Sequence, residues 1–176
     1  MYLKIAFNLA AVLFLIMVQF GFVSALPGVF CDVNILLIAM VFVLFLFGTE
    51  IASGWAVGLG FFKDAFSYQP FGLFILSFAL SFFLAYFLLN NFFTNRSLYS
   101  FLALSASTIV GYKLVLYLLS FAFRFFGMTD LNLAIGKAFW LNEGASLFLN
   151  LAIATVIFYL INYLSKRLKP AFLLKR

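Results

Sequence analysis

The chain has 176 residues, of which 67% are hydrophobic, 22% are aromatic and only 9% are charged. Soluble domains contain roughly 45 to 50% apolar residues, so the composition excludes an ordinary soluble domain and predicts an integral membrane protein. The absence of His and the presence of one Cys exclude a Ser-His dyad, a His-ligated metal and an intramolecular disulfide. Because the five acidic residues are spread one per segment, we expect no catalytic residue, no cofactor and no metal site.

The apolar stretches predict an all-α protein, a single bundle of about six transmembrane helices. The first stretch follows Lys4 and is longer than the apolar part of a signal peptide, so we expect it to stay in the protein as a span. Pro27-Gly28 has the turn chemistry to end it. The second and third stretches are short and are separated by Gly48-Thr49-Glu50, which leaves open two spans or a bent pair. The expected spans are 5–26, 33–47, 51–64, 71–93, 98–123 and 145–165.

Residues 127–144 lie between the last two spans and mix polar with apolar positions. Their spacing predicts a short helix on the outer surface, with Trp140 at the level of the lipid headgroups. Glu143-Gly144 is then expected to turn the chain into the last span.

Basic residues predict the orientation. The C-terminal tail, residues 166–176, carries five of the eleven Lys and Arg residues. An even number of spans places this tail, Lys4 and Arg96 on one side, which the positive-inside rule makes cytoplasmic, so both termini are expected there. We expect the tail to touch anionic lipid, where each positive charge contributes about 1 kcal/mol, or an acidic protein face, and not nucleic acid.

Small residues at helical spacing predict close helix packing. Without a hydrophobic drive between helices in lipid, such residues let backbones approach. Each stripe is expected to pack inside the bundle or to dock another membrane protein. The three stripes are Glu50, Gly54 and Gly58; Ser77, Ser81 and Ala85; and Ser107 and Gly111.

The segment from Gly58 to Gly72 holds Lys63 and Asp64 in an otherwise apolar region. At 1.5 Å per helical residue, Asp64 and Lys113 lie about 20 and 22 Å from the inner boundary. Because an ionisable group at membrane depth usually faces a partner, we predict an Asp64–Lys113 pair. The alternative places Lys63 and Asp64 at the outer interface, with Lys113 reaching outward along its stem.

The spacing of Gly60, Asp64, Ser67, Pro70 and Gly72 after two short spans resembles the rod shape-determining protein MreD family. In that family the stretch reads as glycine, three apolar residues, aspartate and a small polar turn leading to Pro-x-Gly.

Three further positions bear on the resemblance. Asp32-Val33-Asn34 after the first span is similar to the family's entry to its second span, although Cys31 stands in place of Pro. Lys63 and Tyr68 depart from the apolar and small residues usual at their positions. Asn95-Arg96-Ser97 is compatible with the family's inner loop.

The resemblance implies a non-enzymatic scaffold of the bacterial inner membrane that supports cell elongation, rod shape and lateral peptidoglycan synthesis. Its implied partners are an MreC-like bitopic protein, a RodA-like glycosyltransferase with its penicillin-binding transpeptidase, and, indirectly, MreB filaments. Candidate structural or partner-binding residues are Asp32, Gly54, Gly58, Gly60, Asp64, Pro70, Gly72, Arg96 and Lys113.

The alternative function belongs to another class. Six short spans with polar residues also suit the substrate-binding subunit of an energy-coupling-factor vitamin transporter, a fold that the MreD architecture resembles. That function predicts a polar pocket near the outer surface, whereas a scaffold is expected to lack one and to co-purify with a bitopic partner. An ion pathway would need a line of ionisable groups through the membrane, for which the sequence offers only Asp64 and Lys113.

Overall fold

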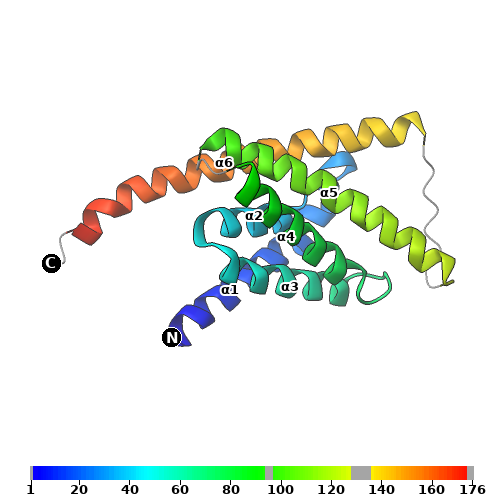
Figure 1. Cartoon of the computed structure of the whole chain (residues 1–176), viewed down its shortest axis with the longest axis horizontal. Coiled ribbons are helices and arrows are strands. Elements are labelled where there is room, and N and C mark those ends of the chain that lie inside the picture. Colours follow the sequence, from blue (N-terminus) through cyan, green and yellow to red (C-terminus); the bar gives the residue numbers. More distant parts are fainter. Residues whose placement is uncertain (1, 94–96, 128–135, 174–176) are drawn as a thin grey trace.

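The computed structural model describes residues 2–93, 97–127 and 136–173, and these ranges form helices with no β-strand (Figure 1). Within these ranges four segments are long and apolar enough to cross a membrane: Asn8–Ala25, Leu73–Asn91, Leu98–Phe125 and Lys137–Leu160. The expected all-α, multi-pass architecture is therefore seen. In chain order the elements are α1 (Tyr2–Gly21), the 3₁₀ turns η1 (Val23–Ala25) and η2 (Gly28–Asp32), α2 (Ile35–Phe47), α3 (Thr49–Phe66), α4 (Leu73–Asn91), α5 (Leu98–Phe125) and α6 (Lys137–Leu173).

Helix α2 forms the centre of the fold. It contacts α1, α3, α4, α5 and α6, and nine of its 13 residues are buried. A helix that is apolar on all sides belongs in a core, and 13 residues extend over only about 20 Å, less than the roughly 30 Å of a bilayer's hydrocarbon layer. The second apolar stretch is therefore a short core helix, separated from α3 by the single residue Gly48.

Helix α4 packs between α3 and α5. The residues of its small-residue stripe, Ser77, Ser81 and Ala85, are all buried within the bundle. On α5, a Cβ added at Gly111 would lie 2.5 Å from the Leu84 side chain, so the α5 stripe also serves the α4–α5 contact. These two stripes are internal packing surfaces.

Helix α6 corrects the expectation for the region before the last span. It begins at Lys137 and continues through Glu143 and Gly144 without a turn. A single glycine costs a helix only about 1 kcal/mol, and the side chain of Glu143 is held by α5, so the helix has no reason to stop there. Trp140 is an exposed residue of this helix, while residues 128–135 of the expected surface helix lie outside the described part.

At its other end, α6 runs through the first part of the expected basic tail to Leu173 and extends beyond the other helices (Figure 1).

Candidate functional site

Asp64, the last acidic residue of α3, caps the start of α4. Its side chain is buried and accepts hydrogen bonds from the backbone N–H groups of Gly72, Phe74 and Ile75 at 3.1, 2.9 and 2.9 Å. The first N–H groups of a helix have no partner within it, and a carboxylate also interacts favourably with the positive end of the helix dipole. Asp64 therefore joins the end of one helix to the beginning of the next.

The other residues of the Gly58–Gly72 segment complete this junction. Ser67 donates its hydroxyl and its backbone N–H to the carbonyl of Asp64, both at 3.2 Å. The carbonyl of Pro70 accepts from Leu73 N–H at 3.3 Å. Gly72 has a φ of 101°, a left-handed conformation that favours glycine.

Gly60 explains why α3 and α4 lie so close. A Cβ added at this residue would be 2.8 Å from the Cα atom of Ile75 and 3.2 Å from the carbonyl oxygen of Phe74. Because these atoms belong to the backbone of α4, only glycine permits this approach. The residues with the family-like spacing thus form one local structure.

The predicted Asp64–Lys113 pair is wrong. Lys113 forms an ion pair with Glu143 of α6 and donates to the Ser146 hydroxyl at 2.9 Å. Tyr117, one turn further along α5, donates to the other Glu143 oxygen at 2.7 Å. The alternative, which places Lys63 and Asp64 at the outer interface, stays a prediction; Asp64 is buried among the helices. The predicted membrane depths of Asp64 and Lys113 are similar, but Asp64 faces α4 and Lys113 faces α6.

The connection between α1 and α2 is held by two buried side-chain amides. Gln19 of α1 donates to the carbonyl of Val33 at 2.9 Å and accepts from Ile35 N–H at 2.9 Å. Asn150 of α6 accepts from Asn34 N–H at 2.8 Å and donates to the carbonyl of Asp32 at 3.4 Å. Backbone groups outside regular helix are thereby satisfied in an apolar interior.

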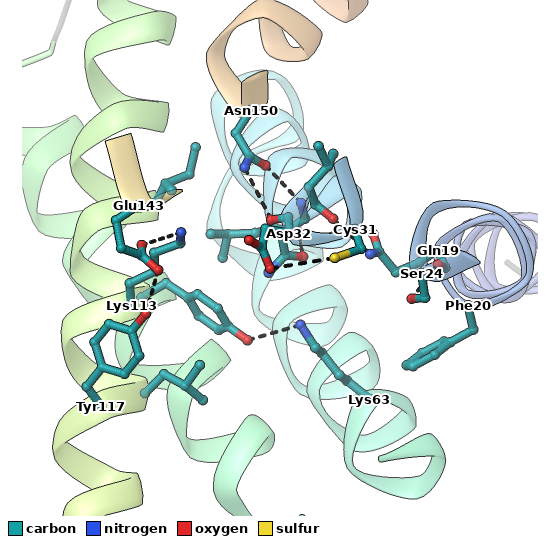
Figure 2. A pocket seen from close by; sticks show the side chains of 16 residues that line it. Gln19, Phe20, Ser24, Cys31, Asp32, Lys63, Lys113, Tyr117, Glu143 and Asn150 are labelled. Carbon is teal, nitrogen blue, oxygen red and sulfur yellow. Dashed lines mark hydrogen bonds and ion pairs between the residues drawn. The ribbon is translucent and has the colours of Figure 1, made fainter. Parts of the chain in front are cut away.

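These groups surround a polar cavity of about 280 Å³ (Figure 2). Side chains from α1, the η2 turn, α3, α5 and α6 line it, so segments that are distant in the sequence meet there. Its polar and charged lining residues are Gln19, Ser24, Cys31, Asp32, Asn34, Lys63, Tyr112, Lys113, Tyr117, Glu143 and Asn150.

Lys63 reaches this cavity from α3 (Figure 2). Its ammonium donates to the hydroxyl of Tyr112 at 3.2 Å. The nitrogen also lies 4.9 Å from the ring centre of Phe74, 5.9 Å from that of Phe78 and 5.4 Å from that of Tyr112. Aromatic faces attract a cation, but they do not neutralise its charge.

The structure divides the remaining candidate residues. Asp32 and Lys113 both line the cavity. Gly54 and Gly58 lie on α3, where a Cβ added at either position meets no atom within 4 Å. Arg96 lies outside the described residues.

Sequence reasoning missed Gln19, Tyr117, Glu143 and Asn150 as site residues. Gln19 and Asn150 carried a signal that was available, because a polar amide within an apolar span is costly unless it is hydrogen-bonded. Glu143 was instead assigned to a turn, which removed the natural partner of Lys113 from consideration.

Comparisons with protein-family models, with curated proteins and with solved structures find no match to this chain.

Proposed function

We propose that this protein is a non-enzymatic scaffold of the MreD type in the bacterial inner membrane, supporting rod shape and lateral peptidoglycan synthesis. Its direct partner would be an MreC-like bitopic protein. Through it the scaffold would organise a RodA-like glycosyltransferase with its penicillin-binding transpeptidase and, indirectly, MreB filaments. The observation that carries the proposal is the α3–α4 junction.

The junction supports the proposal because the residues that carry the resemblance act together. Gly60 allows close approach of the backbones, Asp64 caps α4, and Gly72 supplies the left-handed turn. Residues that matched the family spacing only by chance would have no reason to act together in one local structure. The spacing therefore reads as a structural requirement that related chains would share.

A scaffold also needs a face that the bundle leaves free. The stripes on α4 and α5 are used internally, whereas Glu50 and Gly54 are exposed, Gly58 is partly exposed, and no neighbouring atom lies near either glycine. Helix α3 has 18 residues, is about 27 Å long and packs along α4, which is one of the four segments long and apolar enough to cross a membrane, whereas α3 itself is not. We propose that the Glu50–Gly54–Gly58 stripe receives the membrane helix of the bitopic partner.

In this proposal both termini are cytoplasmic, and the basic residues at the C-terminal end contact anionic lipid. The fold would be that of an energy-coupling-factor substrate-binding subunit, used here for assembly.

The test is membrane crosslinking of the full chain co-expressed with an MreC-like partner. Replacing both Gly54 and Gly58 by Leu should reduce partner capture roughly tenfold at an unchanged protein level, since blocking close helix contact costs about 1 to 2 kcal/mol. Gly21→Leu is the matched control, because Gly21 is also an exposed helical glycine with open space around it. Equal capture by all variants would contradict the proposed docking face.

The cavity favours a second candidate function. A polar pocket is the feature expected of the substrate-binding subunit of a small-molecule transporter, whereas a scaffold is expected to lack one. The cavity of 280 Å³ is just below the roughly 300 Å³ at which ligand pockets begin. The same crosslinking experiment separates the two functions. Capture of an ATP-driven transport module would favour the transporter subunit and overturn the scaffold.

A further inference from the structure

Two lysines and two acidic residues line the polar cavity, and among the described residues only one lysine and one acid form an ion pair. Lys113 and Glu143 form an ion pair with each other. Lys63 forms no ion pair with any described residue, and its hydrogen bond to Tyr112 occupies one of three N–H donors. Ionisable groups at membrane depth usually pair with an opposite charge, so the unpaired ammonium requires an explanation.

Asp32 does not supply the missing charge. It also lines the cavity, but it is an exposed residue, its carboxylate lies 4.0 Å from the Cys31 sulfur, and among the described residues no ion pair joins it to Lys63. In Figure 2 the dashed line from Lys63 marks its hydrogen bond to the Tyr112 hydroxyl, and no dashed line joins Lys63 to Asp32. The cavity beside Lys63 can therefore accept a negatively charged group.

We propose that the cavity binds a small molecule through a carboxylate or phosphate group that accepts a hydrogen bond from the Lys63 ammonium. Such a group supplies an ion-pair partner for Lys63 and accepts from N–H donors other than the one bound to Tyr112. The cavity volume of 280 Å³ equals roughly nine water molecules at about 30 Å³ each, which limits the bound portion to a small molecule or a headgroup. This inference does not depend on the scaffold role.

The probes are sodium acetate and sodium phosphate, added to the purified full chain in detergent at constant ionic strength. A ligand that binds the folded state raises the unfolding temperature with its concentration, and the dependence yields a dissociation constant. A separate arm compares nanodiscs containing phosphatidylglycerol or phosphatidylcholine. Stabilisation by the anionic lipid but by neither soluble anion would identify a headgroup as the source.

Lys63→Met should weaken binding about tenfold to a hundredfold, the size of effect expected for a charge-assisted hydrogen bond. Lys137→Met is the matched control, because it removes the same charge from an exposed residue that does not line the cavity. It should bind as wild type does. Lys63→Met should also capture the bitopic partner normally, which separates this test from that of the scaffold.

A second variant keeps the test decisive if Lys63→Met does not fold. Asp32→Asn removes a negative charge from the cavity lining, so it should tighten anion binding several-fold. The proposal is overturned if neither anion nor the anionic lipid stabilises the wild type, if Lys63→Met binds as tightly as wild type, or if Asp32→Asn weakens binding.

Discussion

Replacing Asp64 by Asn should destabilise the protein, because one carboxylate serves three backbone donors at the start of α4. One oxygen accepts from Phe74, and the other accepts from Gly72 and Ile75. An asparagine retains one acceptor oxygen and presents an NH₂ group in place of the other, so at least one of these backbone N–H groups loses its partner. The negative charge at the helix N-terminus is lost as well.

The expected cost is about 2 to 4 kcal/mol, the sum of one lost hydrogen bond to a charged group and the helix-dipole interaction. For a chain of this size, 1 kcal/mol shifts the unfolding midpoint by roughly 2 to 4 °C. The variant should therefore unfold roughly 4 to 16 °C below wild type in detergent, and its level in the membrane should fall.

The matched control is Asp32→Asn, which makes the same chemical change on an exposed residue. Its effect should stay within about 0.5 kcal/mol, a shift of no more than about 2 °C. If Asp64→Asn unfolds at the same temperature as this control, the capping role is refuted. Unchanged stability with loss of partner capture would instead assign Asp64 to the partner interface.

Two further predictions concern the contacts of α3 and α5. Gly60→Ala should destabilise the protein by about 1 to 3 kcal/mol, because its Cβ would press on the backbone of Ile75. Gly58→Ala, one half-turn away and facing open space, should instead be neutral or stabilise by up to about 1 kcal/mol; thermal unfolding that ranks the two the other way would contradict the close approach. Lys113→Met or Glu143→Gln should each cost about 2 to 3 kcal/mol, toward the lower end for a buried pair because the side chains are 19% and 21% exposed. A double-mutant cycle should show coupling between them, and additive losses would refute the pair.

Much of the fold could be predicted from local signals. Apolar length predicted the long helices, and Gly48 and Pro27-Gly28 predicted where the chain turns. The position of α2 could not be assigned this way, because a short apolar stretch has the same composition whether it is enclosed by other helices or bent within lipid. Its 13 residues are too few to span the hydrocarbon layer, which in retrospect favours a core helix.

The polar connections were harder to predict because they depend on tertiary contacts. Gln19 and Asn150 hold the same connection from opposite sides, although 131 positions separate them. No local pattern links two such residues. Glu143 shows the converse difficulty, since an acidic residue followed by glycine has turn chemistry locally but is kept helical by a partner on α5.

The failed Asp64–Lys113 prediction identifies what depth in the membrane leaves undetermined. The side chains of neighbouring residues on a helix point about 100° apart, so residues 63 and 64 face different helices although they lie at nearly the same height along α3. Lys63 meets Tyr112 on α5, and Asp64 meets the start of α4. Lys113, one position after Tyr112, turns in the same way toward α6. Helices α3 and α5 do meet, through Lys63 and Tyr112, each one position from a member of the predicted pair. Asp64 therefore caps α4 and does not pair with Lys113. Lys63 lines the cavity with an ammonium that forms no ion pair with a described residue. For this reason Lys63, and not Asp64, is the group to test for ligand binding.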